Sequence, residues 1–163
     1  MVFRATIGVV SGQQRTTMVY TDGACRGNPG KGGWGWVVPG GAQASGGSPK
    51  TTNQRMELTA VLEAVRNLEG PLEIYSDSTY VTTCFRDGWW EGWIKRGWRN
   101  SDKKAVANRD LWEPLIEQVQ ARDIKFVWVK GHSGDPWNDE ADRLATEAAD
   151  EQPDEPESVV TLF

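Results

Sequence analysis

Cysteine and histidine are scarce in this sequence of 163 residues, which contains two cysteines and one histidine. Two cysteines are too few for a disulfide framework, so we expect a protein of the reducing cytoplasm. Neither Cys25 nor Cys84 stands at a zinc-ligand spacing, and one histidine cannot build a histidine-rich site, which argues against a zinc centre. We expect both thiols to pack as small buried hydrophobic groups.

Long apolar runs are also lacking. No stretch approaches the roughly 18 residues of a membrane span, so we expect no membrane association. The first ten residues do not resemble a secretory signal, because Arg4 and Thr6 interrupt a short apolar segment and no cleavage site closes it. We therefore expect a cytoplasmic protein that forms one domain with a substantial core.

Positive charge is not in excess, since the formal net charge is −5. The acids gather at the C-terminal end, however, where six acids and no base follow from Glu147 onward. The rest of the chain holds 18 basic and 17 acidic residues, with seven bases against three acids between Arg86 and Arg109. A local basic region matters more for phosphate binding than the total charge, so a nucleic-acid substrate is not excluded.

After residue 50, short strand-forming segments alternate with helical patterns, which implies parallel strands joined by right-handed crossovers. Before it, two short runs around Pro39-Gly-Gly41 indicate a hairpin. We therefore predict an α/β fold whose five-stranded mixed sheet combines an antiparallel meander of strands 1–3 with parallel strands 4 and 5, flanked by helices. The expected strands are 18–22, 34–38, 42–45, 72–77 and 124–129, and the expected helices are 54–68, 79–86, 109–122 and one starting at Pro136.

Residues 26–33 are rich in turn-forming residues, and we expect a loop there. The pair Gly30-Lys31 invites comparison with a phosphate-binding P-loop. That comparison fails because position 25 is Cys where the first Gly is needed, Gly32 replaces Ser or Thr, and a strand follows rather than a helix.

Four acids stand in unusual places for carboxylates. Asp22 interrupts a strand, although Asp is depleted in strands. Glu57 heads the core-facing stripe of its helix, one turn before Val61, where a plain helix-dipole acid is the alternative interpretation. Asp77 ends a strand, and Asp142 lies one turn after Asn138 on the last helix.

Such acids need positive partners if they meet. Two carboxylates about 4 Å apart repel by roughly 4 kcal/mol at an effective dielectric near 20. An all-oxygen ligand set suits Mg²⁺ or Mn²⁺. A pair of these ions can clamp the attacking and leaving oxygens of a phosphodiester. We therefore predict a two-metal site that cuts nucleic acid.

Seven short motifs along residues 18–149 together resemble those of type 1 ribonuclease H, the bacterial ribonuclease HI family. The motifs are Tyr20–Cys25, Gly27–Gly30, Thr51–Leu58, Tyr75–Tyr80, Gly92–Trp98, Val129–Gly134 and Asn138–Asp142. The resemblance implies a ribonuclease H-like fold. It also implies an endonuclease that hydrolyses the RNA strand of RNA/DNA hybrids and leaves 3′-hydroxyl and 5′-phosphate ends.

The resemblance also implies the catalytic roles. Two Mg²⁺ ions, for which Mn²⁺ can substitute, would be held by four acids. Asp22 would bridge both ions, with Glu57 and Asp77 on one side and Asp142 on the other. His132 matches a histidine on a mobile loop that shuttles a proton or helps product release, and a surface loop histidine is the alternative.

Substrate contacts follow from the same resemblance. Asn28, Asn53 and Gln54 match groups that sense the 2′-hydroxyl. Asn28 and Thr52, with Arg55 nearby, match a pocket for a phosphate of the DNA strand. The remaining substrate-binding residues that we predict are Trp89, Lys95, Arg96 and Asn138, with Lys95–Lys104 matching a basic protrusion. For the tryptophans we expect Trp112 and Trp128 to be structural and Trp89 or Trp90 to be exposed to solvent.

The two ends lie outside the motifs. We expect a leader at 1–17 with an extra strand near 3–10, a catalytic domain at 18–149, and an acidic tail at 150–163, disordered over 150–158. Residues 159–163 either pair with the leader strand or contact a replication protein, and we favour the strand. We expect a monomer.

Two rival functions share the fold. A non-catalytic hybrid-binding module needs a broken acid set, whereas all four acids are present. A resolvase or integrase shares scattered acids but lacks the combination of Asn28, Thr52 and the His132 loop. A purely structural protein leaves the four acids unexplained.

Overall fold

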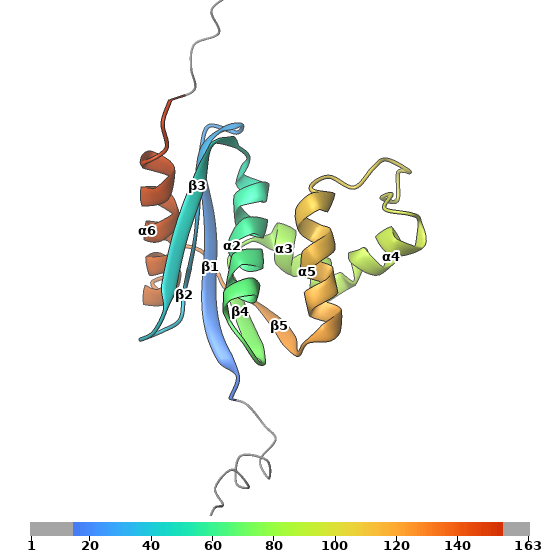
Figure 1. Cartoon of the computed structure of the whole chain (residues 1–163), viewed down its shortest axis with the longest axis horizontal. Helices are drawn as coiled ribbons and strands as arrows, with labels where there is room; N and C mark the ends of the chain where they lie inside the picture. Colours follow the sequence, from blue (N-terminus) through green and yellow to red (C-terminus); the bar gives the residue numbers. More distant parts are fainter. Residues whose placement is uncertain (1–14, 155–163) are drawn as a thin grey trace, which may run out of the picture.

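A computed structural model describes residues 15–154 and contains one mixed five-stranded sheet in the order β3-β2-β1-β4-β5, with helices on both faces (Figure 1). The predicted fold class is confirmed. The strands are β1 (Thr17–Arg26), β2 (Gly30–Val37), β3 (Gln43–Thr51), β4 (Leu72–Ser76) and β5 (Ile124–Trp128). The helices are α2 (Asn53–Asn67), α3 (Thr79–Asp87), α4 (Trp89–Lys95), α5 (Arg109–Ala121) and α6 (Pro136–Asp150).

The sheet has an antiparallel half and a parallel half. β1, β2 and β3 form the predicted meander, while β4 pairs in parallel with both β1 and β5. In this register Thr21 lies beside Ser76, so Asp22 within β1 and Asp77 just after β4 stand at the same level of the sheet. The topology therefore brings the two aspartates together at the carboxyl end of β4.

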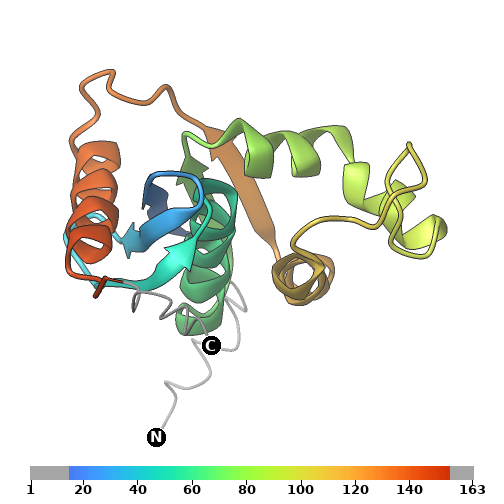
Figure 2. The same cartoon turned by 90° about the horizontal axis from the view of Figure 1, so that it is seen from above.

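Glycines in β2 allow α6 to lie close against the sheet. A Cβ atom built on Gly33 would stand 2.1 Å from the carbonyl oxygen of Ala145, and one on Gly35 would stand 2.6 Å from the Cβ of Leu144. α2 covers the opposite face of the sheet, as the two perpendicular views show (Figures 1 and 2). The helix that carries Asp142 is thus held by direct contact between its backbone and that of β2.

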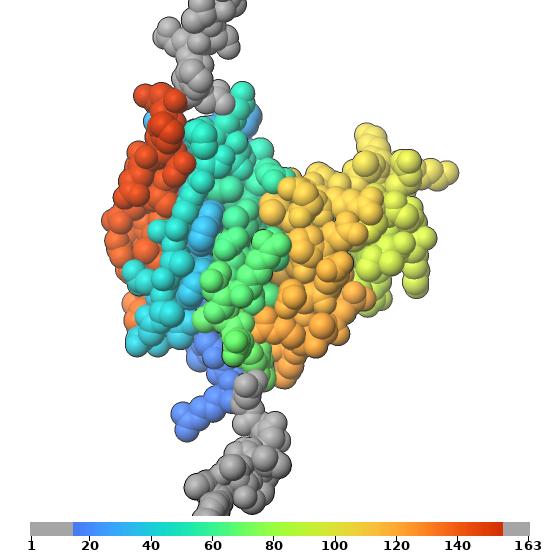
Figure 3. All heavy atoms as spheres, viewed as in Figure 1, coloured from blue at the N-terminus to red at the C-terminus, as the bar shows by residue number. Residues whose placement is uncertain are grey.

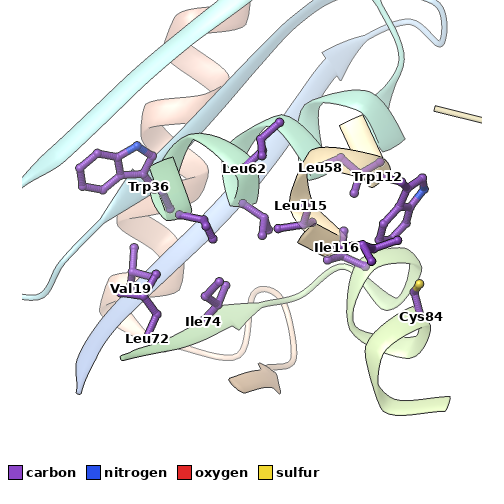
Figure 4. Close-up of a cluster of buried hydrophobic side chains, with 14 of the residues drawn as sticks. Val19, Trp36, Leu58, Leu62, Leu72, Ile74, Cys84, Trp112, Leu115 and Ile116 are labelled. Carbon is purple, nitrogen blue, oxygen red and sulfur yellow. The ribbon is translucent and has the colours of Figure 1, made fainter. Parts of the chain in front are cut away.

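The main core lies between the sheet and α2, α3 and α5. Its fully buried side chains include Leu58, Ile74, Trp112 and Leu115 (Figure 4). Trp112 contacts the rings of Tyr80 and Phe85, and its indole N–H donates to the Tyr80 hydroxyl at 2.8 Å. The core therefore fixes α2 and α3, which begin directly beside the acids.

α4 and the loop after it project from the end of the molecule opposite α6 (Figure 3). The sequence patterns did not predict this helix, which is short and contains Gly92. Its anchor is Trp93, which is buried against Trp112 and Trp98. The packing of Trp93 therefore fixes the segment that carries the basic residues of this region.

Three local predictions were wrong. The expected loop at 26–33 is a tight hairpin, since β1 extends to Arg26 and β2 starts at Gly30. The near-continuous apolar run of residues 124–129 predicts a strand covered on both faces, but β5 is partly exposed because it forms an edge of the sheet. Trp128, expected to be structural, is 51% exposed, while Trp89 is exposed as expected and Trp112 is buried.

The ends of the chain are described in part. The predicted leader strand at 3–10 and the segment 159–163 lie outside the described residues. Within the described part of the tail, Asp150 belongs to α6 and Asp154 forms an ion pair with Lys31, which differs from the disorder that we expected. In residues 15–154 no helix is long and apolar enough to cross a membrane.

Candidate active site

Three of the predicted acids form one compact cluster. Asp22 lies on β1, Glu57 in the second turn of α2, and Asp77 directly after β4. One carboxylate oxygen from each lies within 4.8 Å of the others. Asp22 and Glu57 are buried, whereas Asp77 is half-buried, so the cluster opens to solvent on the side of Asp77.

Glycines permit this close approach. A Cβ atom on Gly23 would lie 2.4 Å from the backbone nitrogen of Glu57, so only glycine lets α2 come this near to β1. The N–H of Gly23 donates to the Asp22 carboxylate at 2.9 Å. On the other side, a Cβ atom on Gly131 would lie 2.8 Å from Oδ2 of Asp77, so the loop that carries His132 also needs glycine there.

Burial and mutual repulsion disfavour the charged forms of these acids. Burial raises the pKa of Asp22 to about 8, and the neighbouring Asp77 carboxylate adds to the shift. Burial likewise raises the pKa of Glu57 well above its usual value, followed by repulsion from Asp22 and Asp77. The pKa of Asp77 is raised mainly by burial, although interactions with the side chains of Asp22 and Asn138 and the charge of His132 act against the shift. Without a positive partner the cluster therefore retains protons.

Asp142 completes the predicted set from the opposite face of the sheet. It is half-buried on α6, and its carboxylate adds to the effect of burial in raising the pKa of both Asp22 and Asp77. It lies outside the compact cluster of three but within electrostatic reach of it. The structure thus brings all four acids to one place from four separate elements.

The cluster has the chemistry of a divalent cation site. Its donors are carboxylate oxygens, which Mg²⁺ and Mn²⁺ prefer. Within residues 15–154, Oε2 of Glu57 is buried without a hydrogen-bond partner. An unpaired buried carboxylate oxygen is costly unless a cation or proton satisfies it. The residues present therefore fit a metal.

Three further groups surround Asp77. Asn138 is 2% exposed, and its side chain acts to lower the pKa of the Asp77 carboxyl, while its predicted substrate contact stays a prediction. The indole N–H of Trp128 donates to the Asp77 carbonyl at 3.2 Å. His132 is exposed on its loop with a left-handed backbone (φ 55°), and its charge would lower the pKa of Asp77.

The predicted hybrid contacts near the start of α2 lie together. Asn28 stands in the β1–β2 turn, and its side-chain oxygen accepts from the backbone N–H of Asn53 at 3.1 Å. Thr52 caps α2 by accepting from the N–H of Arg55 at 3.3 Å, and Gln54 is exposed beside it. These groups occupy the rim next to Glu57.

Arg55 is engaged within the protein. Its guanidinium donates to both carboxylate oxygens of Asp110, at 2.9 and 2.7 Å, and to the side chain of Asn108 at 3.2 Å. The predicted phosphate contact of Arg55 therefore competes with an internal ion pair. Neither Asn108 nor Asp110 was found from the sequence, because both lie more than 50 residues from Arg55.

Trp89, Lys95 and Arg96 lie on α4 and at its end, away from the acids. All three are exposed. Trp89 and Arg96 line a cavity of about 460 Å³ together with Trp93 and Asn100. A second cavity, of about 650 Å³, lies along β5 between Phe85 and Val119 and contains none of the acids. The acid cluster and the basic protrusion are thus two separate parts of one surface.

Two contacts in the site had no visible signal in the sequence. Gly131 and Trp128 both touch Asp77, but a glycine in a loop and a tryptophan in a strand have common structural roles. Both residues lie near His132 in the sequence, but such proximity alone does not identify a residue of the site. Only the folded geometry assigns them to the site.

Comparisons with known proteins agree with the resemblance seen in the sequence motifs. A profile of the family described as RNase H matches residues 14–150. The Ribonuclease H of Chlorobium luteolum is 47% identical over 145 residues, which cover 86% of this chain and 99% of that protein. The Ribonuclease H of Erythrobacter litoralis is 51% identical over 139 residues, which cover 82% of this chain and 96% of that protein.

Solved structures share the architecture. LC9-RNase H1, described as a type 1 RNase H with the type 2 active-site motif, matches with a TM-score of 0.70 and 31% identity, over 86% of this chain and 76% of that chain. LC11-RNase H1, solved in complex with RNA/DNA hybrid, matches with a TM-score of 0.64 over 83% of this chain and 97% of that chain. Its 22% identity shows likeness of fold alone.

Proposed function

The chain belongs to the RNase H family and is an endonuclease that hydrolyses the RNA strand of RNA/DNA hybrids. We propose that the three clustered acids, together with Asp142, hold two Mg²⁺ ions for this reaction. The observation that supports the proposal best is the convergence of Asp22, Glu57 and Asp77 within 4.8 Å. The carboxylates of Asp22, Glu57, Asp77 and Asp142 would hold the ions. Mn²⁺ would substitute for Mg²⁺, because both prefer oxygen ligands.

When bound, such ions would supply an activated water and neutralise the charge that develops on the phosphate, leaving 3′-hydroxyl and 5′-phosphate ends. The protein supplies position. Burial of Asp22 and Glu57 keeps bulk water from their inner oxygens, and the buried Asn138 side chain favours the charged form of Asp77. His132 lies on an exposed loop next to Asp77, where its imidazole would accept or return a proton as product leaves.

The hybrid would bind across the rim of the site. The side chains of Asn28, Asn53 and Gln54 are exposed beside Glu57 and would contact the 2′-hydroxyls of the RNA strand. Thr52 with Arg55 would hold a phosphate of the DNA strand. The exposed Trp89, Lys95 and Arg96 would support the duplex farther along, since backbone contacts position a duplex without reading its sequence.

For the setting of the enzyme we propose the cytoplasm, which the low cysteine count and the two free thiols support, and we propose that the protein is a monomer. Catalysis would reside in residues 18–149, between a leader and an acidic tail. A contact of the tail with a replication protein is the weaker of the two roles proposed for its end, and pairing with the leader is the stronger.

The test is cleavage of end-labelled RNA in four settings: hybrid with DNA, single strand, RNA duplex, and hybrid with EDTA. We expect cutting only in the hybrid with Mg²⁺ or Mn²⁺, and loss of cutting in Asp77→Asn. Glu117→Gln is the control, because Glu117 is an exposed acid on α5. Tight hybrid binding without cutting in either metal would instead indicate a binding module.

A further inference from the structure

A basic surface lies at the tip of the β1–β2 hairpin. A cavity of about 490 Å³ is lined by the side chains of Arg26, Lys31 and Lys50 together with Pro29 and Pro49. Arg26 and Lys31 are partners across the hairpin, so their side chains leave the same face of the sheet. We call Arg26, Lys31 and Lys50 the hairpin surface.

The hairpin surface and the acid cluster lie on the same face of the sheet, at the two ends of the stretch that α6 covers. Arg26 follows Asp22 by four residues on β1, so the two side chains share a face about 13 Å apart along the strand. The pKa of the Arg26 guanidinium is raised mainly by Asp150 and also by the charge of Asp142, which therefore reaches this surface. A duplex at the cluster that ran towards the hairpin would need about four base-pair steps to place a backbone phosphate at the hairpin surface.

Acids at the end of α6 occupy this surface. The guanidinium of Arg26 donates to both carboxylate oxygens of Asp150, at 2.8 and 3.0 Å, and Lys31 lies 2.5 Å from a carboxylate oxygen of Asp154. These partners lower the pKa of both carboxyls, by the hydrogen bond from Arg26 for Asp150 and by that from Lys31 for Asp154. α6 runs beside β1, so the helix that brings Asp142 to the cluster also brings Asp150 to the hairpin.

These ion pairs can be exchanged for others. Side chains of Arg26 and Asp150 are 53% and 56% exposed, and that of Asp154 is 91% exposed. Exposed ion pairs contribute little to stability, so a phosphate can replace either carboxylate with small loss to the fold. A carboxylate and a backbone phosphate both present anionic oxygens that accept hydrogen bonds from a guanidinium.

We propose that Arg26 and Lys31 bind backbone phosphates of the hybrid beyond the cleavage site, and that Asp150 and Asp154 compete with those phosphates. The proposal rests on the hybrid as substrate and goes beyond the four acids and the contacts described above. The two acids then weaken hybrid binding without touching the chemistry, and their removal makes binding tighter and more dependent on salt.

The test compares two pairs of substitutions that remove the same charge. Asp150→Asn with Asp154→Asn frees the hairpin surface. Glu140→Gln with Glu147→Gln is the control, because both of these acids pair with Arg143 instead. Hybrid affinity is measured by fluorescence anisotropy in EDTA, and cleavage is measured separately with Mg²⁺ over a range of salt concentrations.

We expect the first pair to lower the Kd about fivefold more than the control pair does, with kcat unchanged. Its plot of log affinity against log salt should be steeper by about one to two units, since each additional phosphate that the protein neutralises adds about 0.9. Adding Arg26→Ala and Lys31→Ala should cancel the increase in affinity. Equal effects of the two pairs, or tighter binding that persists without Arg26 and Lys31, would overturn the proposal.

Binding and cleavage separate this proposal from the proposed function. Anisotropy in EDTA reports on the hairpin surface even in a protein that does not cut. If no form of the protein cuts the hybrid but the two pairs of substitutions differ in binding as expected, the metal mechanism is rejected and the role of the hairpin surface is supported. If cleavage is confined to the hybrid but the two pairs do not differ in binding, the proposed function is supported and the role of the hairpin surface is rejected.

Discussion

Asp22 is buried with two other acids around it, and its position favours the neutral form when no cation is present. Substitution by asparagine keeps the shape and removes the repulsion. We expect Asp22→Asn to raise the free energy of unfolding of the metal-free protein at pH 8 by about 2 kcal/mol or more. We expect kcat to fall about a hundredfold or more, because a charge that acts in the transition state is lost.

Thermal melting in EDTA and single-turnover cleavage in Mg²⁺ check the two effects together. Glu117→Gln, which removes an exposed acid from α5, should change neither. A metal-free Asp22→Asn protein that is less stable than the wild type would contradict the repulsion inferred at the cluster.

The raised pKa of Asp22 also predicts how stability depends on pH. Its pKa rises on folding from the ordinary 3.8 to about 8, so the folded protein binds more protons than the unfolded chain between these values. The contribution of Asp22 to stability is therefore full below about pH 4 and is lost as the pH rises towards 8. Glu57, with its pKa shifted in the same direction, adds to the loss.

Melting temperatures across pH 4–8 in EDTA test this sign. The wild type should lose stability relative to Asp22→Asn as the pH rises. Added Mg²⁺ should raise the melting temperature more at pH 8 than at pH 5, because a cation binds the deprotonated acids. A difference in melting temperature between the two proteins that stays constant across this range would refute the raised pKa of Asp22.

At the scale of elements, the seam between β2 and α6 sets the distance from Asp142 to the other acids. Gly33→Ala would place a Cβ atom 2.1 Å from the carbonyl oxygen of Ala145, so α6 would have to shift. We expect a loss of about 1–3 kcal/mol in the free energy of unfolding. We also expect a fall of about a hundredfold in kcat, since an error of about 1 Å in a catalytic group has effects of that size.

Gly41→Ala, in the turn between β2 and β3, is the matched control. Its Cβ atom would meet only Val38, at 3.3 Å or more, and urea unfolding and kcat should change little. Full activity in a folded Gly33→Ala protein would show that the seam does not position Asp142.

Some elements could be predicted from the sequence and others could not. Asp135 and Pro136 are strong start signals, and α6 begins there. The β1–β2 hairpin differs from the expected loop because Gly30, Gly32 and Gly33 are poor strand formers by themselves. Pairing with β1 and β3 and close contact with α6 override that preference in the fold. α4 has no clear sequence signal because its seven residues are held by tertiary contacts of Trp93.

The same contrast holds for the site. The acids were predicted from their odd positions and from their resemblance to a family, and the structure brings Asp22, Glu57 and Asp77 together. What the sequence could not show is the closeness of Gly131 to Asp77 or the engagement of Arg55 by Asp110. Both depend on distances between segments far apart in the chain.

At the scale of the whole molecule, negative charge at the cluster and at the end of α6 is balanced by bases on the distant protrusion. The double substitution Lys95→Ala with Arg96→Ala should raise the KM for hybrid about fivefold with kcat unchanged. The salt dependence of kcat/KM should become shallower by up to about two units, because each phosphate that is no longer neutralised removes about 0.9.

The control is Arg66→Ala with Lys125→Ala, which removes two bases outside α4 and its loop. Steady-state cleavage at several salt concentrations distinguishes the pairs. If both pairs raise KM equally, net charge rather than the protrusion governs hybrid binding.

The four acids come from β1, α2, the end of β4 and α6, in the order in which a ribosome makes them. A nascent chain that has folded as far as β4 carries Asp22, Glu57 and Asp77 but has not yet received Asp142. The last acid arrives only when α6 has been made and docks against β1 and β2. If Asp142 holds a metal as proposed, cutting activity begins only after α6 has docked, and a nascent chain that ends before α6 does not cut the hybrids around it.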